Sequence, residues 1–129
     1  MTTRIATSKG RVLYELHGDL AGADLSGLRL IGAQLQGQSL CGSNLSGACL
    51  TGADLDEADF SDALLAGAIM EGVHCSDARF DDASLRGADL YWAFAFRASF
   101  RGADLTGADL RGQIRDSGPG RWASPAHRG

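Results

Sequence analysis

A nonpolar residue recurs at every fifth position over most of this chain. The series begins at Leu20 and continues to Leu110 without interruption. Its members are Leu20, Leu25, Leu30, Leu35, Leu40, Leu45, Leu50, Leu55, Phe60, Leu65, Met70, Cys75, Phe80, Leu85, Leu90, Ala95, Phe100, Leu105 and Leu110. Internal repetition of this kind constrains the fold more strongly than the secondary-structure propensity of any single segment.

A spacing of five excludes both regular secondary structures. On an α-helix, five residues displace each leucine by about 140° from the previous one, so no buried face forms. On a straight strand, an odd spacing sends successive leucines to opposite sides, and a single core cannot bury both. The pattern therefore predicts a chain that turns a corner every five residues and keeps each leucine on the inside.

Glycine and alanine support this interpretation by their positions. The chain has 18 glycines and only 2 prolines, and a glycine commonly stands two residues after the central leucine, as at Gly22 and Gly27. Glycine tolerates the positive φ that a tight corner requires. Alanine commonly stands two residues before the leucine, where we expect a small inward-facing side chain. Residues adjacent to the leucine then face water.

The chain resembles the pentapeptide-repeat family, whose motif Ala-(Asp/Asn)-Leu-x-x is matched by the letters ADL at 23–25, 53–55, 88–90, 103–105 and 108–110. The resemblance implies an all-β fold, a right-handed quadrilateral β-helix of about five coils in which residue n lies over residue n+20. We expect an N-terminal hairpin cap, the β-helix itself, and an irregular, partly disordered C-terminal tail. These parts span residues 1–17, 18–112 and 113–129.

The implied stacking makes further predictions about the interior. Phe60, Phe80 and Phe100 fall in one inner column, and we expect them to fill space left by the small residues Cys75 and Ala95 in the next. Gln38 takes an inner position in the top coils, beneath Gly18, so we expect its amide to be hydrogen-bonded near the cap. In the hairpin, the alternation predicts one face with the side chains of Val12, Tyr14 and Leu16.

Signals of catalysis are weak throughout the sequence. The three histidines, His17, His74 and His127, have no partner at a spacing typical of a nucleophile or a metal site. We expect His74 to face water beneath Asp54. The three cysteines, Cys41, Cys49 and Cys75, are odd in number and lack a Cys-x-x-Cys spacing, so we expect reduced, structural thiols. We therefore predict no catalytic residue, no cofactor and no metal.

Composition also bounds the location. No run of 18 apolar residues is present, and the N-terminal residues lack the long apolar segment of a secretory signal. We accordingly expect a cytoplasmic protein that does not bind a membrane.

Acidic residues gather in the middle of the repeats. Residues 54–82 hold nine carboxylates against Arg79 alone, a net charge of 1 − 9 = −8. The predicted acidic patch consists of Asp54, Asp56, Glu57, Asp59, Asp62, Asp77, Asp81 and Asp82. A solubilising belt and a surface for a basic partner are both open interpretations, of which the belt is favoured.

Aromatic residues gather later, at the C-terminal end of the repeats. The letters YWAFAF at 91–96 place Tyr91, Trp92, Phe94 and Phe96 outward or at a corner. With the neighbouring Arg97 and Arg101 they form our candidate interface, because exposed aromatics beside arginine are enriched in protein interfaces. A local register slip that buries Phe94 or Phe96 in place of Ala95, and coverage by the tail, are the alternatives.

Two functions follow as hypotheses. The first is a non-catalytic scaffold for an unidentified protein partner, which also forms a homodimer through the C-terminal coils and does not bind nucleic acid directly. The second is a DNA-mimicking inhibitor or protector of DNA gyrase, as the resemblance implies. Residues 18–112 carry 14 acidic and 6 basic side chains, a net of −8, whereas duplex of the same length carries about 14 charges. The scaffold is therefore the first hypothesis.

Overall fold

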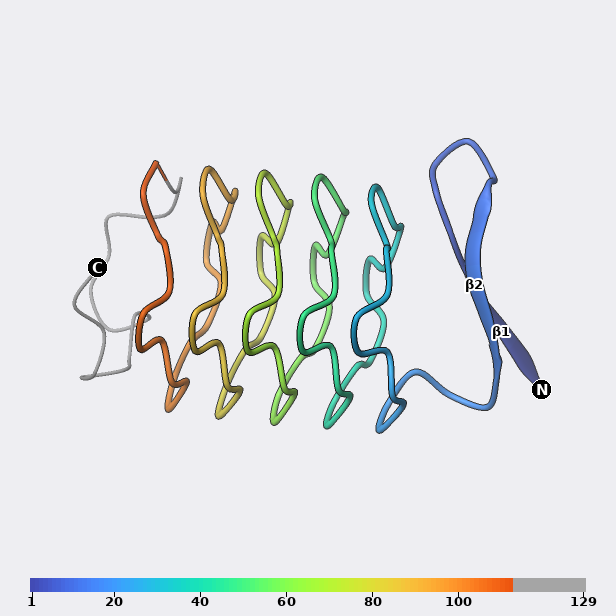
Figure 1. The fold of residues 1–129 in the computed structure, drawn as a ribbon, viewed down its shortest axis with the longest axis horizontal. Helices are drawn as coiled ribbons and strands as arrows, with labels where there is room; N and C mark the ends of the chain where they lie inside the picture. Colours follow the sequence, from blue (N-terminus) through green and yellow to red (C-terminus); the bar gives the residue numbers. More distant parts are fainter. Residues whose placement is uncertain (113–129) are drawn as a thin grey trace.

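The computed structural model describes residues 1–112 as a hairpin followed by a stack of square coils (Figure 1). The hairpin pairs β1 (Thr2–Ala6) with β2 (Val12–His17) in antiparallel orientation. It lies at the N-terminal end of the stack (Figure 1). Within these residues no helix is long and apolar enough to cross a membrane.

The coils pair through short parallel bridges between residues twenty positions apart. Asp24 pairs with Asn44, and Asn44 pairs in turn with Leu64. Each coil has four faces, which we name after their first central residues: the Leu20, Leu25, Leu30 and Leu35 faces. The predicted stacking of residue n over n+20 is therefore present.

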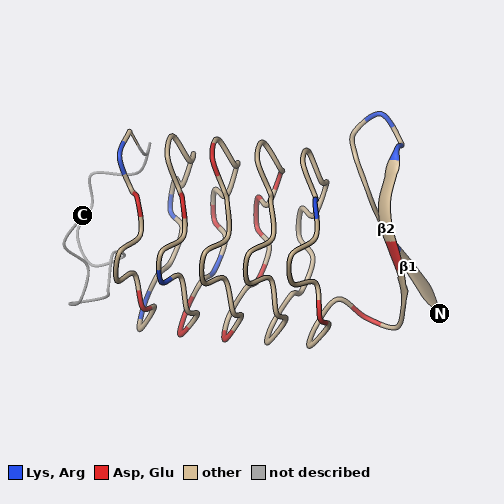
Figure 2. Cartoon of the chain, viewed as in Figure 1, with Lys and Arg blue, Asp and Glu red and all other residues tan. Residues whose placement is uncertain are grey.

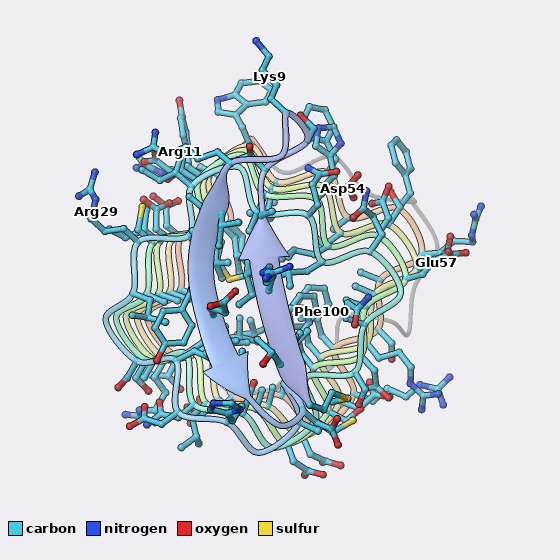
Figure 3. All side chains as sticks on the ribbon, turned by 90° about the vertical axis from the view of Figure 1, so that its right-hand side faces the viewer. Lys9, Arg11, Arg29, Asp54, Glu57 and Phe100 are labelled. Atoms are coloured by element: carbon cyan, nitrogen blue, oxygen red, sulfur yellow. The ribbon has the colours of Figure 1, made fainter. Side chains whose placement is uncertain are left out.

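The core is the inside of the coil. Every central residue from Leu20 to Leu105 is at most 5% exposed, and Leu110 is half-buried. The rings of Phe60, Phe80 and Phe100 stack along the Leu20 face at centroid distances of 5.1 and 4.9 Å. Phe100 lies inside the ring of the coil when the molecule is seen from its N-terminal end (Figure 3). The fivefold series therefore marks the buried residues correctly.

Two expectations near the N-terminus are wrong. A β-bulge between Ile5 and Ala6 shifts the hairpin register so that Ala6 pairs with Val12. Val12 is consequently exposed, while Leu13, Tyr14 and Leu16 pack partly against the core. Ile5, which the alternation did not single out, is completely buried.

Gln38 is the second correction. Its side chain is exposed and makes no hydrogen bond within residues 1–112. It lines an open hollow with Met1, Thr3 and Asp19, where the hairpin does not cover the first coil. Because water reaches the amide there, no buried partner is needed.

The corners have the backbone conformation that the glycines predicted. Gly22, Gly27 and their equivalents have φ between +64° and +74° along the coils. Six residues with side chains adopt the same left-handed conformation at corners without glycine: Glu57, Asp62, Asp77, Asp82, Trp92 and Arg97.

Candidate interaction surface

The predicted acidic patch and the candidate interface lie on adjoining parts of the coil. On the Leu35 face, Asp54, His74 and Phe94 form one column of paired positions. Trp92 lies at the corner that precedes this face, and Arg97 at the corner that follows it. Acidic residues are concentrated in the middle coils, as Figure 2 shows. The acidic patch and the candidate interface are separate in the sequence, whereas the twenty-residue stacking joins them into one surface.

The aromatic residues of this surface face outward. Tyr91, Trp92 and Phe96 are 39, 49 and 42% exposed, while Phe94 is half-buried. Ala95 occupies the inner position at 1% exposure. The alternative of a register slip is therefore wrong. Coverage by the tail lies outside the described residues.

Local contacts hold two aromatic pairs in place. The Phe94 ring stacks on the His74 imidazole with a centroid distance of 4.8 Å and an interplanar angle of 9°. The Tyr91 and Trp92 rings meet edge to face at 5.9 Å. The Arg111 guanidinium lies 5.5 Å from the centre of the Tyr91 ring, within cation–π range. His74 thus lies beneath Asp54 as expected, but it also stacks on Phe94 of the candidate interface.

Four of the eight carboxylates in the acidic patch accept hydrogen bonds from backbone N–H groups or hydroxyls of the coil. Asp54 accepts from the Asp56 N–H at 3.1 Å, and Asp59 accepts from the Ser61 N–H and hydroxyl at 3.0 and 2.6 Å. Further bonds are those of Asp56 with Ser76 N–H, and of Asp81 with the Ser99 hydroxyl and Arg101 N–H. The bonds of Asp54 and Asp59 fix turns within a coil, whereas those of Asp56 and Asp81 join neighbouring coils.

The turn-fixing role was missed from the sequence, although its signal is present. An aspartate or asparagine before the central residue accepts a hydrogen bond from the N–H two positions later, as in Asp104-Leu105-Thr106. The hydroxyl of Thr106, then the side chain of Arg86, donate to Asp104 and lower the pKa of its carboxyl to about 2. Hydrogen bonds from Arg111 likewise lower the pKa of Asp109 to about 2.

Three other carboxylates of the patch lie exposed at strained corners. Glu57, Asp62 and Asp82 have φ of 64°, 62° and 60°, and their side chains make no hydrogen bond or ion pair within residues 1–112. The corner before Ala63 lies over the corner before Ala83, so Asp62 and Asp82 are like charges in one column. Neither local bonding nor backbone preference explains these acids.

One ion pair links the acidic patch to the arginines of the candidate interface. Arg97 donates to Asp77 through Nε at 2.8 Å and Nη2 at 2.9 Å, one coil apart. Both side chains are exposed, so the pair contributes little to stability. It forms one wall of a hollow of about 300 Å³, which Arg79, Asp81 and Arg101 also line. The structure thus brings acidic and interface residues into direct contact.

The cysteines are unpaired, and one is inaccessible to reagents. Burial raises the pKa of the Cys75 thiol to about 12, with a smaller effect from Asp56. It is therefore a neutral, inward-facing group at physiological pH. Within residues 1–112 no group of three or more His, Cys, Asp or Glu side chains is arranged to hold a metal ion.

The strained corners predict a gain in stability when an acid is replaced by glycine. Asp62→Gly is expected to raise the free energy of unfolding by about 0.5–1 kcal/mol, because φ above zero suits glycine and the repulsion from Asp82 is removed. Ala66→Gly is the control, since Ala66 has ordinary φ and should lose roughly 0.5–1 kcal/mol. Urea unfolding of both variants measures the two changes. Destabilisation by Asp62→Gly would show that the carboxylate has a structural role.

Comparisons with known proteins agree with this geometry. A family model described as pentapeptide repeats matches residues 19–56, 58–94 and 96–112 in 8 copies. A pentapeptide repeat protein from the thylakoid lumen of Arabidopsis thaliana is 34% identical, with a TM-score of 0.50 over 71% of this chain. The chain covers 64% of that protein, less than two thirds of its length. No curated protein matches in sequence.

Two further solved structures are similar to this chain in sequence. A pentapeptide repeat protein from Nostoc PCC 7120 is 30% identical over 74% of this chain and 76% of its own, with a TM-score of 0.45. A trypsin-treated variant of QnrB1, a plasmid-mediated fluoroquinolone resistance protein, is 27% identical over 74% of this chain and 59% of its own, with a TM-score of 0.44.

Proposed function

This chain belongs to the pentapeptide-repeat family, and from that premise we propose that it is a non-catalytic scaffold whose aromatic and acidic surface binds protein. The match to the family model confirms the family, and with it the right-handed β-helix, that the sequence led us to expect. The scaffold function goes one step further. It includes a homodimer formed through the C-terminal coils, where Trp92 and Phe96 lie.

The position of the strained corners carries this proposal. All six non-glycine residues with positive φ in residues 1–112 belong to the acidic patch or to the candidate interface. Side chains at such positions cost free energy that glycine would not, and strained residues concentrate at functional sites. Asp77 and Arg97 bond to each other across one coil, whereas we infer that Glu57, Asp62, Asp82 and Trp92 are retained for what they contact outside the coil.

The composition of the surface favours a protein partner. Tyr91, Trp92 and Phe96 offer apolar area, and Arg97 and Arg101 border them. Trp, Tyr and Arg are the residues most enriched in interface hot spots. The unpaired cysteines are consistent with a cytoplasmic location, which we propose along with the scaffold function.

A DNA-mimicking inhibitor of DNA gyrase has less support. Half of the patch carboxylates are occupied with local hydrogen bonds, and Asp77 pairs with Arg97. A surface that imitates duplex DNA needs regularly spaced, uncompensated charge on the scale of one per 1.7 Å. We therefore expect no inhibition of gyrase supercoiling at micromolar protein. Inhibition that weakened after Glu57→Gln and Asp62→Asn would favour the mimic instead.

Sedimentation equilibrium tests the scaffold surface. The wild-type chain is expected to dimerise, and the double variant Trp92→Ser, Phe96→Ser to associate at least about tenfold more weakly, because both aromatics leave the interface. The matched control is Leu64→Ser, Ile69→Ser, which removes two exposed apolar residues on the Leu25 and Leu30 faces. A wild-type monomer at high concentration, or equal weakening by the control, would contradict the proposed dimer.

A further inference from the structure

The first coil has an open backbone edge on the Leu30 face. In the next coil, Cys49 is hydrogen-bonded on this edge, since its carbonyl accepts from Leu30 N–H and its N–H donates to Leu28. Arg29 is the equivalent residue of the first coil. Within residues 1–112, neither the N–H nor the carbonyl of Arg29 has a hydrogen-bond partner. The carbonyl of Ile31 is also open, whereas its equivalent Thr51 accepts from Gly32 N–H.

The hairpin already occupies the neighbouring part of the same edge. Gln34 N–H donates to the Ala6 carbonyl at 2.9 Å, and Thr7 forms an antiparallel bridge with Ala33. An extended segment therefore can pair with the first coil on its Leu35 face. Because the hairpin crosses the end of the coil, it leaves the Leu30 face uncovered.

A basic hollow lies between the hairpin and this open edge. It has a volume of about 240 Å³ and is lined by Thr7, Arg11, Leu13, Arg29 and Ile31. Arg11 and Arg29 form no ion pair within residues 1–112. Both project from the side of the molecule opposite Glu57, with Lys9 nearby at the hairpin tip (Figure 3). The hollow thus combines an apolar floor with two available guanidinium groups.

We propose that this hollow binds an extended acidic peptide segment of another protein, which adds a strand to the first coil. The carbonyls of Arg29 and Ile31 accept N–H groups of the peptide, and Arg29 N–H donates to it. Alternate side chains of the added strand point to opposite sides, so an apolar one contacts Leu13 while carboxylates pair with the arginines. This site is at the end of the coil away from the aromatic surface and goes beyond the proposed scaffold function.

Charge and backbone pairing distinguish this occupant from parts of the same chain. Residues 113–129 contain Arg115, Arg121 and Arg128 against Asp116 alone, so their charge opposes binding beside two arginines. The acidic patch of a second copy cannot add as a strand, because its backbone is already paired: Glu57 N–H donates to Ser76, and Asp62 N–H to Asp81. A separate extended acidic segment fits both requirements.

Fluorescence anisotropy with a defined peptide tests the proposal. The probe is a labelled heptapeptide with blocked ends that alternates valine and glutamate. We expect it to bind wild type, and to bind the Arg11→Glu, Arg29→Glu variant at least about tenfold more weakly. The matched control is Arg86→Glu, Arg111→Glu, which makes the same charge change at exposed positions of later coils and should retain affinity. Circular dichroism checks that both variants fold.

Two altered peptides separate strand addition from general charge attraction. The peptide with lysine in place of glutamate should not bind, and the acidic peptide with N-methylated backbone amides should lose about tenfold or more. Equal binding of the N-methylated peptide, equal loss in both arginine variants, or no binding of the acidic peptide would each overturn the proposal. So would a change in the sedimentation of Arg11→Glu, Arg29→Glu without peptide binding, which would assign the edge to a second copy.

The scaffold surface is tested separately. Trp92→Ser, Phe96→Ser should bind the acidic peptide with wild-type affinity while it loses self-association. The failure of one proposal is therefore distinguishable from the failure of the other.

Discussion

Replacement of Phe80 by alanine is expected to lower the free energy of unfolding by about 3–5 kcal/mol. Phe80 is completely buried and stacks between Phe60 and Phe100, with interplanar angles of 5° and 8°. Its removal leaves a cavity between two rings whose backbone is fixed by the coil above and the coil below. Because Cys75 and Ala95 are small, the neighbouring column on the Leu35 face has no bulky side chain there to fill that space.

Urea unfolding measures this effect. The slope of the unfolding free energy against urea concentration is compared between the variants. Phe80→Leu retains most of the volume and should lose distinctly less than Phe80→Ala. Leu64→Ala is the surface control and should change stability by less than about 0.5 kcal/mol. An unchanged slope shows that the coils still unfold together, whereas a smaller slope shows that the cavity uncouples them. A loss below about 1.5 kcal/mol for Phe80→Ala would contradict a rigid phenylalanine column.

The interior of the coil was predictable because one rule is repeated many times. A single leucine such as Leu45 says nothing about a β-helix, but its spacing from Leu40 and Leu50 excludes a helix and a straight strand together. Small deviations such as Ala95 do not shift the register, since Leu90 and Phe100 on either side fix the neighbouring corners. Repetition therefore averages out the local ambiguity that limits prediction in other folds.

The N-terminal end of the stack and the surface were less predictable for physical reasons. Gln38 follows the inward register, yet the position above it is Gly18, which has no side chain, so the Gln38 amide lies in an open hollow and stays in water. A one-residue bulge in the hairpin leaves Val12 exposed and not on the predicted inner face, and the alternation of the sequence alone does not reveal that bulge. Periodicity shows which residues face outward, but it does not show that His74 stacks on Phe94 or that Arg97 reaches Asp77 one coil away.

The strained corners illustrate what a sequence reveals only in part. The absence of glycine at position 57 or 62 is visible at once. From the sequence alone, such a corner could equally have adopted a wider turn without a positive φ. Only the structure shows that the neighbouring coils impose the glycine conformation on Glu57 and Asp62, and hence that these side chains carry a cost.

One fully buried residue of the hairpin closes the N-terminal end of the core, and this gives the second large prediction. Ile5 is the one residue of β1 that is completely buried, and it closes the core where the first coil has no coil before it. Ile5→Ala is expected to lower the free energy of unfolding by about 2–5 kcal/mol, through lost burial and the cavity that remains.

The Ile5 variant should also aggregate more readily. The hairpin protects part of the first coil by the bond from Gln34 N–H to Ala6, and a loosened hairpin exposes that edge to other chains. Val12→Ala is the matched control on the same hairpin, because Val12 is 49% exposed and should lose less than about 1 kcal/mol. Urea unfolding and light scattering of the two variants measure both effects. Equal stability of Ile5→Ala and Val12→Ala would mean that the coil keeps its end closed without the hairpin, and that the first coil is stable as an uncovered edge.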